Sequence, residues 1–253
     1  MTSQAGTLRV GVLGAHGRMG TEATRAIDAS DDLELSAALG SADDLSEFER
    51  TDTDVVVELT VPTATEDNVT SLVGRGFNVV VGTSGWDDAA QDRLRAGLAD
   101  HPDVGVLIAP NFSISAVLAM DFAARAAKYF ESAEVIELHQ PTKVDAPSGT
   151  AVHTASGIAA ARKTAGLPDM PDGTEHSLDG ARGANVDGVR VHSVRMRGLV
   201  AHEEIVFGDA GQQLKITTDS FDRGSFMPGV LHAARTVPGR PGLTVGLENY
   251  LDL

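Results

Sequence analysis

Residues 139–150 read HQPTKVDAPSGT and place an imidazole, an amine and a carboxylate, those of His139, Lys143 and Asp145, in one connection. Histidine exchanges a proton near neutral pH, which suits a general acid or base. A lysine four residues later can hold an anion or donate a proton. Two prolines in the same stretch prevent it from continuing as regular sheet. These residue types at this spacing predict proton transfer beside a bound anion.

A helix that begins directly after this segment completes the expected anion site. Residues 148–163, SGTAVHTASGIAAARK, are rich in alanine and predict a helix that Ser148 can cap. The free N–H groups of a first helical turn attract anions, and Gly149 and Thr150 leave room for one of carboxylate size. With Lys143 as a second positive contact, the expected ligand is a small polycarboxylate.

A glycine-rich turn near the N-terminus has the form that binds the pyrophosphate of a dinucleotide. The apolar strand pattern Leu8–Leu13 runs into GAHGRMG (Gly14–Gly20), and a helical pattern follows over residues 19–29. Glycines at such a junction let the backbone approach the phosphates, while N–H groups at the helix start point at them. Arg18 adds a positive charge. A dinucleotide cofactor is therefore expected at this turn.

The tip of the second expected strand bears on the choice between NADH and NADPH. A carboxylate at this position accepts hydrogen bonds from the adenosine ribose and favours NADH. The strand Leu33–Leu39 instead ends at Gly40 and Ser41, with Asp43 and Asp44 as the nearest acids. No arginine stands beside the tip to bind the 2′-phosphate of NADPH. The sequence therefore predicts weak discrimination, with NADPH at least tolerated.

Three polar clusters follow other expected strands. They are ELTVP (Glu58–Pro62), GTSG (Gly82–Gly85) and APNFS (Ala109–Ser113). Each cluster alone indicates only a turn, because Gly, Ser, Thr, Asn and Pro are common turn residues. Ligands of open α/β sheets, however, lie at the carboxyl ends of strands. Together the clusters predict the rim of one site, in which Asn111 could hold a nicotinamide or a bound carbonyl.

The pattern of elements divides the chain into two architectures. In the first half, apolar strands alternate with helices, which indicates a parallel sheet covered on both faces. These strands are Leu8–Leu13, Leu33–Leu39, Asp54–Leu59, Asn78–Thr83 and Gly105–Pro110, with helices near 19–29, 64–75 and 87–99. After Asn111 the expected elements are a long helix over 114–130, a strand over 134–139, the helix over 148–163, a loop over 164–188, strands over 189–196, 202–208 and 212–218, a helix over 225–235 and a strand over 242–247. Short connections between the middle strands favour antiparallel pairing. The fold class is α/β, a Rossmann-like parallel-sheet domain plus an α+β domain with a mainly antiparallel open sheet.

Composition excludes several classes of function. The 253-residue chain has a formal charge of −16, which disfavours nucleic-acid binding. It has no cysteine, so disulfides and thiolate metal sites are excluded, and no metal site is expected. The start of the chain lacks the basic and apolar regions of a leader, and no apolar run approaches the roughly 18 residues that a membrane span needs. These features fit a cytoplasmic protein.

Over essentially its whole length, the sequence resembles the dihydrodipicolinate reductase (4-hydroxy-tetrahydrodipicolinate reductase) family of the diaminopimelate–lysine pathway. The resemblance is carried by GAHGRMG, GTSG, APNFS, ELHxxxKVDAPSGTA, the loop GARGANVDG and the C-terminal PGLTVGLENYL. It implies a cytoplasmic enzyme that reduces 4-hydroxy-tetrahydrodipicolinate to tetrahydrodipicolinate with NADPH or NADH. The implied chemistry is loss of the 4-hydroxyl as water, hydride delivery to C4 and protonation at C3.

The resemblance also implies an organisation and an assembly. Residues 1–112 and 221–253 would form the dinucleotide-binding domain, and residues 113–220 an inserted substrate-binding and tetramerisation domain. A homotetramer would assemble through the sheets of the inserted domain.

Matched position by position, the resemblance assigns roles to individual residues. His139 and Lys143 would be catalytic. The substrate would be held by Gln140, Lys143, Ser148, Gly149 and Thr150. The cofactor would be held by Gly14, Ala15, His16, Gly17, Arg18 and Met19 at the pyrophosphate and by Gly82, Thr83, Ser84, Ala109, Pro110, Asn111 and Phe112 on the nicotinamide side.

Three positions depart from the family's usual pattern. Gln140 replaces a second histidine, so it can form hydrogen bonds but cannot carry charge. The usual Asp-Phe-Thr strand end is Glu58-Leu59-Thr60, which keeps a carboxylate and loses an aromatic ring. Gly40 replaces an acidic residue at the tip of the second strand.

Two other functions are compatible with the same elements. One is a reductase or dehydrogenase of similar architecture that acts on another small dicarboxylate. The other is a non-catalytic Rossmann module that senses a nucleotide or binds a partner. The sensor has no need of His139 and Lys143 beside a carboxylate site.

Overall fold

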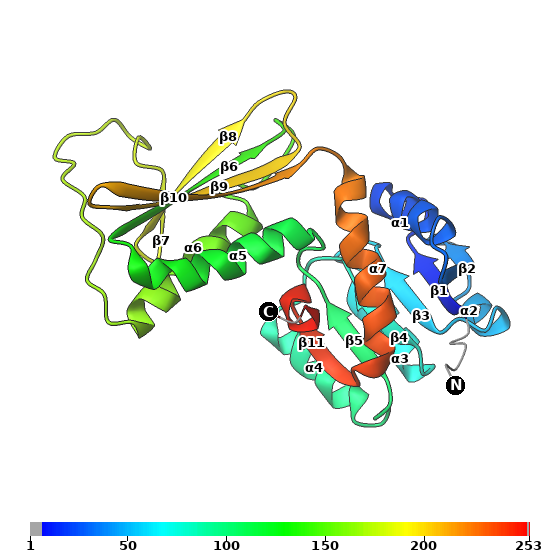
Figure 1. The fold of residues 1–253 in the computed structure, drawn as a ribbon. Helices are drawn as coiled ribbons and strands as arrows, with labels where there is room; N and C mark the ends of the chain where they lie inside the picture. The colour runs from blue at the N-terminus through cyan, green and yellow to red at the C-terminus, as the bar shows by residue number, and fades with distance from the viewer. Residues whose placement is uncertain (1–6, 252) are drawn as a thin grey trace. The chain divides into compact units, whose positions relative to one another are not determined.

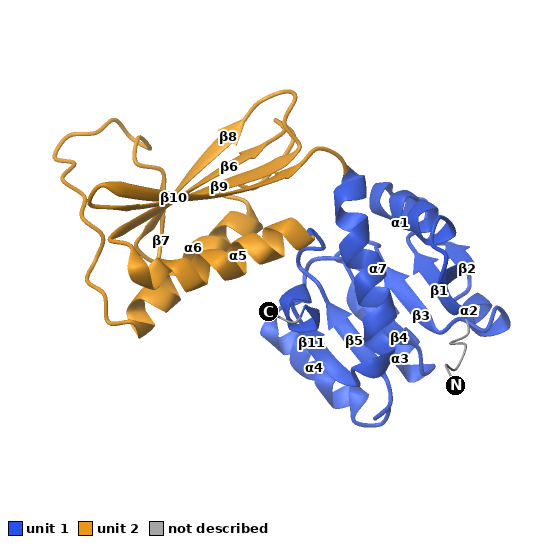
Figure 2. Ribbon diagram, viewed as in Figure 1, with its two compact units in different colours: residues 1–113, 223–253 blue, residues 114–222 orange. Residues whose placement is uncertain are grey.

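The computed structural model describes residues 7–251 and residue 253, which form two compact units (Figures 1 and 2). Unit 1 joins the chain up to Ser113 with residues 223–253, and unit 2 contains residues 114–222. The division expected from the resemblance placed the boundaries after residues 112 and 220. Residues 1–6, part of the segment inspected for a leader, lie outside the described residues. Within the described part of the chain, no helix is long and apolar enough to span a bilayer.

Unit 1 is a six-stranded parallel sheet with helices on both faces. The strands are β1 (Leu8–Leu13), β2 (Leu33–Leu39), β3 (Val55–Glu58), β4 (Asn78–Val81), β5 (Gly105–Ile108) and β11 (Gly242–Val245). The helices are α1 (Arg18–Asp28), α2 (Ser46–Arg50), α3 (Thr65–Gly74), α4 (Asp88–Leu98) and α7 (Met227–Thr236), with 3₁₀ turns η2 (Arg223–Phe226), η3 (Val237–Gly239) and η4 (Leu247–Tyr250). Helix α1 packs beside α7, and α3 packs beside α4. All three valines of β3 are fully buried, as expected of a strand covered on both faces.

The strand order of this sheet creates a ligand-binding edge. The order is β11-β5-β4-β3-β1-β2, so β2 lies on one side of β1 and β3 on the other. The direction of winding therefore reverses at β1, and open α/β sheets bind ligands at the carboxyl ends of the strands beside such a reversal. Because neighbouring strands are parallel, the turns after β1, β3, β4 and β5 all lie along this edge.

Unit 2 is a five-stranded sheet with two helices, α5 and α6, packed on one face (Figure 1). Its elements are α5 (Ile114–Ala126), the 3₁₀ turn η1 (Ala127–Tyr129), β6 (Ser132–His139), α6 (Gly149–Thr164), β7 (Ala184–Val186), β8 (Val189–Arg195), β9 (Ala201–Asp209) and β10 (Gln212–Ser220). Alanines of both helices meet Val135, Ile205 and Phe207 of the sheet in an apolar core. Small alanine side chains let the helices approach the sheet closely.

Four local details differ from the sequence-based expectations. The helix expected over 114–130 ends at Ala126 and continues as the tighter turn η1, after which Phe130 is extended. Helix α2 was not expected, and β7 lies inside the expected loop over 164–188.

The fourth difference concerns strand pairing. β8 and β9 follow each other closely in the chain, yet they do not pair. They flank β6, which is parallel to β8 and antiparallel to β9. Strand β6 therefore forms ladder hydrogen bonds along both of its edges, and its end lies at the centre of the five-stranded sheet.

Candidate active site

The end of β6 carries two polar side chains on the face that α6 covers. Glu137 and His139 are two residues apart, so their side chains point to the same side of the strand. Ala133 and Val135 precede them on this face and belong to the apolar core. The inner face of β6 therefore changes from apolar to polar at its carboxyl end.

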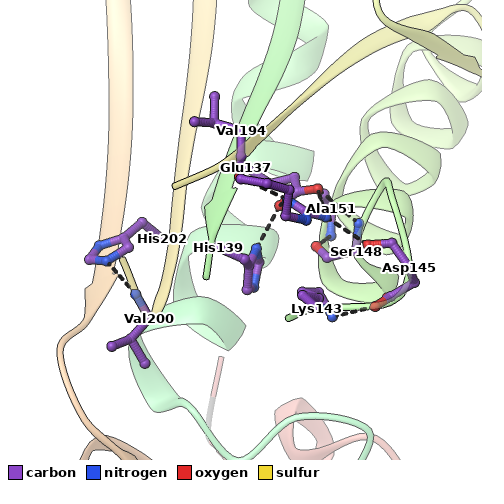
Figure 3. A network of polar contacts seen from close by, with 10 residues as sticks. Glu137, His139, Lys143, Asp145, Ser148, Ala151, Val194, Val200 and His202 are labelled. Carbon is purple, nitrogen blue, oxygen red and sulfur yellow. Dashed lines mark hydrogen bonds and ion pairs between the residues drawn. The ribbon is translucent and has the colours of Figure 1, made fainter. Parts of the chain in front are cut away.

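Glu137 is fully buried and accepts several hydrogen bonds (Figure 3). Arg195 of β8 donates two bonds of 2.8 Å, one to each carboxylate oxygen. The backbone N–H of Ser148 donates at 3.2 Å, and Nδ1 of His139 lies 2.5 Å from Oε2. Burial would raise the pKa of Glu137, but hydrogen bonds from Arg195, Ser193 and His139 lower it to about 2. Glu137 is therefore a carboxylate at neutral pH.

The charge on Glu137 fixes the state of His139. A carboxylate can only accept, so Nδ1 of His139 carries the proton and Nε2 remains for proton exchange. Burial lowers the pKa of His139, the nearby charges of Lys143 and Arg195 lower it further, and Glu137 opposes both effects. The imidazole is therefore neutral near pH 7, and its side chain is 14% exposed.

The loop after β6 holds a second charged pair. Nζ of Lys143 lies 2.7 Å from Oδ1 of Asp145, and this contact lowers the pKa of Asp145 (Figure 3). The backbone carbonyl of Asp145 accepts a 2.6 Å hydrogen bond from Arg195. Arg195 thus binds both the Glu137 carboxylate and the loop that carries Lys143. The Lys143 side chain is 24% exposed, which leaves the ammonium accessible to an anion.

The residues predicted to hold the substrate lie in this loop and in the first turn of α6. The hydroxyl of Ser148 accepts a hydrogen bond from Ala151 N at 3.2 Å, so Ser148 caps α6 and is itself buried. Gly149 is exposed, and a Cβ at this position would meet nothing within 4 Å. Gln140 is also exposed, and its backbone carbonyl accepts from Lys143 N in a turn. Gly149 therefore leaves space for a ligand at the helix start, where its backbone N–H also faces the Asp145 carboxylate, while Ser148 caps the helix from the buried side.

In unit 1, the turn between β1 and α1 has the shape of a pyrophosphate cradle. Gly14 has φ +85°, and a Cβ there would lie 2.5 Å from the carbonyl oxygen of Leu59. Gly17 precedes α1, and no side chain caps the helix start. The first N–H groups of α1 are therefore left for an external anion. These features fit a dinucleotide, for which Gly14 to Met19 would supply the backbone contacts.

The turns after β4 and β5 touch each other. A Cβ at Gly82 would lie 2.5 Å from the ring of Phe112, which is buried. Thr83 is 8% exposed, and its hydroxyl has no hydrogen-bond partner among the described residues. Asn111 uses Oδ1 to accept from Ser113 N at 2.8 Å. Among the predicted nicotinamide contacts, Ala109 is also buried, while Ser84 and Pro110 are exposed.

The carboxylate at the end of β3 does not face the rim. Glu58 is fully buried and accepts hydrogen bonds from the backbone N–H of Thr60 at 3.2 Å and from the hydroxyl of Thr65 at 2.8 Å. Glu58 therefore fixes the turn between β3 and α3, and its carboxylate is held inside the fold.

A carboxylate does lie at the tip of β2, although residue 40 is glycine. Oδ2 of Asp43 accepts a 2.7 Å hydrogen bond from Gly40 N. A Cβ at Gly40 would lie 2.8 Å from the His16 ring. The absence of a side chain at residue 40 thus leaves room for the His16 ring. Asp43, three residues later, places its carboxylate at the tip of β2 instead.

Sequence reasoning missed the buried carboxyl groups of Glu137 and Glu203 and the half-buried guanidinium of Arg195, all in unit 2. A signal was present in the alternation of β6 and β9, because Glu137 and Glu203 occupy inward positions next to Val135 and Ile205. No group of three His, Cys, Asp or Glu side chains suited to a metal occurs among residues 7–251 and 253.

Two family models together match most of this chain, and known proteins match it over nearly its full length. The family models described as "Dihydrodipicolinate reductase, N-terminus" and "Dihydrodipicolinate reductase, C-terminus" match residues 8–112 and 115–251. A 4-hydroxy-tetrahydrodipicolinate reductase from Bifidobacterium animalis subsp. lactis is 59% identical over 97% of this chain and 100% of its own length. One from Beutenbergia cavernae is 58% identical over 98% of this chain and 100% of its own length. A solved dipicolinate-bound dihydrodipicolinate reductase from a Paenisporosarcina species superimposes with a TM-score of 0.87 at 35% identity, covering 97% of this chain and 100% of that chain. The chain belongs to the dihydrodipicolinate reductase family.

Proposed function

We propose that this chain reduces 4-hydroxy-tetrahydrodipicolinate to tetrahydrodipicolinate in diaminopimelate and lysine biosynthesis, using NADPH or NADH. The observation that carries the proposal is the arrangement at the end of β6, where Glu137 orients His139 beside Lys143 and an open helix start. Full-length relatives at 58% and 59% identity bear the name of this activity. A relative of known structure binds dipicolinate, a cyclic dicarboxylate, which supports a substrate of the same kind.

Each residue of the cluster has a distinct task in this proposal. Lys143 and the N–H groups at Gly149 and Thr150 hold a substrate carboxylate. Nε2 of His139 takes up a proton and passes it on toward C3, because the Glu137 carboxylate at Nδ1 stabilises the charged ring. Lys143 provides a second acidic hydrogen beside it. The reduced dinucleotide, when bound, supplies the hydride for C4.

The cofactor is proposed to bind to unit 1 through Gly14 to Met19, with Thr83 near the nicotinamide. The open helix start and the unpaired hydroxyl of Thr83 support this placement. Cofactor binding is measured directly by titrating the protein with NADH and NADPH and following nicotinamide fluorescence.

A homotetramer that assembles through the sheet of unit 2 is also proposed. Both helices of unit 2 pack on one face of this sheet (Figure 1). The outward positions of β6 include Ile136 and Leu138, which are only partly buried in the single chain. Light scattering coupled to size-exclusion chromatography tests the assembly, and a monomeric mass would refute it.

The deciding experiment is an assay with substrate generated in situ. Wild-type protein should oxidise NADH or NADPH in this assay, whereas Lys143→Ala should lose most turnover and still bind the cofactor. Near-normal turnover of Lys143→Ala would refute the assigned role. Cofactor binding without any oxidation by wild type would favour the nucleotide-sensing alternative.

A further inference from the structure

Two buried carboxyl groups lie side by side beneath α6. Glu137 of β6 and Glu203 of β9 are directly opposite each other in the antiparallel register. They are 0% and 4% exposed. Opposite residues of an antiparallel pair have Cβ atoms about 4.5–5.5 Å apart. The two carboxyl groups are therefore neighbours in a region with almost no solvent-exposed surface.

The partners of the two groups are unequal. Glu137 has the paired hydrogen bonds of Arg195, the Nδ1–H of His139 and a backbone N–H. Glu203 has one hydrogen bond, from the hydroxyl of Thr154 to Oε1 at 2.8 Å. Oε2 of Glu203 is buried and has no hydrogen-bond partner among the described residues. Two such carboxyl groups do not both ionise readily, so the negative charge belongs to Glu137 and the proton to Glu203.

Among the residues that the structure describes, no cation forms an ion pair or hydrogen bond with Glu203. Strand β6 contributes Glu137 and His139, and β8 contributes Arg195, which is already bound to Glu137. Helix α6 contributes Thr154, and the opposite residue of β10 is an uncharged threonine. Burial raises the pKa of Glu203 to about 7, while the hydrogen bond from Thr154 lowers it and the charge of Glu137 raises it.

We propose that Glu203 is a positioning residue of the active site, which must carry a proton for Glu137 to hold Arg195 and His139 in place. In its acid form Glu203 leaves Glu137 as the single negative charge of the pair. Once ionised, Glu203 repels Glu137 and competes with it for Arg195. The orientation of His139 then weakens, and so does proton transfer by the imidazole.

The first test compares wild type with Glu203→Gln, which keeps the size of the side chain and an acceptor for Thr154 but cannot ionise. Turnover is measured from pH 5.5 to pH 9. In wild type, a requirement for the acid form lowers turnover about tenfold one pH unit above the midpoint of Glu203. In Glu203→Gln, the ratio of turnover at pH 8 to that at pH 6 should rise toward one. The matched control is Glu204→Gln, the next residue of β9, which pairs with Lys215 on the other face of the strand.

The second test follows the His139 imidazole by NMR and does not depend on enzyme activity. The ring signals of His139 in a ¹⁵N-histidine-labelled sample should show two inflections with pH in wild type, one from the ring itself and one near pH 7 from Glu203. The second inflection should vanish in Glu203→Gln. If the role of Glu203 were merely structural, Glu203→Gln would lower the thermal midpoint, and the wild-type imidazole would show no second inflection that depends on residue 203.

A further variant should raise the pH at which Glu203 ionises. Thr154→Val removes the hydrogen bond that stabilises ionised Glu203, so both the fall in turnover and the second inflection should move to higher pH. This variant decides the question if Glu203→Gln does not fold.

The proposal is overturned if the second inflection survives in Glu203→Gln, or if Thr154→Val leaves it in place. The kinetic test rests on the proposed function, whereas the titration does not, so an inactive wild type with the expected inflections would count against the proposed function alone.

Discussion

Replacing Glu137 by glutamine separates the charge of this carboxyl group from its shape. The pKa of Glu137 falls from an ordinary 4.5 to about 2 in the folded chain. At about 1.4 kcal/mol for each tenfold change in proton affinity, this difference corresponds to about 3 kcal/mol of folding free energy. Part of it is screened, because the Arg195 side chain is 20% exposed. We therefore expect about 2 kcal/mol from ionisation of Glu137.

The substitution Glu137→Gln also leaves the Arg195 guanidinium without its charge partner, which adds to the loss. At pH 7, Glu137→Gln should therefore lower the free energy of unfolding by about 3 kcal/mol, or the thermal midpoint by roughly 10 °C. Turnover should fall at least about a hundredfold, because His139 loses the carboxylate that fixes its tautomer.

The assay is thermal unfolding followed by circular dichroism from pH 3 to pH 8. A carboxyl group with a lowered folded pKa stabilises the fold above its unfolded pKa and loses this effect as the pH falls. The gap between wild type and Glu137→Gln should therefore be full above pH 4.5 and close toward pH 2. The control is Glu66→Gln, which breaks an exposed pair that Arg93 also forms through two hydrogen bonds and should hardly change the midpoint. A gap below about 1 kcal/mol at pH 7, or one that does not change with pH, would refute the reasoning.

Three further substitutions test other parts of the structure. Asp43→Ala should shift the ratio of NADPH to NADH affinity about tenfold toward NADPH in a fluorescence titration. Among the described residues, the Asp43 carboxylate is the only one that accepts a hydrogen bond from Gly40 N, and the variant removes it. The carboxylate of Asp44 accepts from Ser46 N instead, so Asp44→Ala should leave the ratio unchanged. Gly82→Ala should cost about 1–3 kcal/mol in chemical denaturation, because its Cβ would overlap a buried ring, and an unshifted midpoint would contradict the packing. Gln140→His should change turnover less than about threefold in the coupled assay, because His139 is oriented from Glu137 and residue 140 is exposed; a large gain would show that Gln140 impairs the enzyme.

The parts of the fold that depend on local pattern could be predicted from the sequence. The predicted bounds of β1 and β2 match those of the structure, because runs rich in apolar residues and bounded by glycine or polar residues mark where each strand begins and ends. The cap at Ser148 followed in the same way from residue type and position.

Contacts between distant segments could not be predicted. Arg195 reaches Glu137 across 58 positions only because β8 lies parallel to β6, whereas the short connection between β8 and β9 suggested a hairpin. The position of the Asp43 carboxylate at the tip of β2 depends on a loop conformation that residue types do not determine. The cofactor and substrate roles of individual residues remain predictions that the experiments above address.

The parallel pairing of β6 with β8 has a consequence for the order in which the protein acquires activity. The segment His139–Thr150 and the start of α6 are complete early in synthesis, but the guanidinium that binds Glu137 arrives only with Arg195. Contacts of such sequence separation form late, because the entropy of closing a long loop must be overcome first. A nascent or truncated chain that ends before β8 therefore contains His139 and Lys143 but cannot hold them in a working arrangement. On the proposed function, activity therefore requires that β8 has been synthesised and has paired with β6.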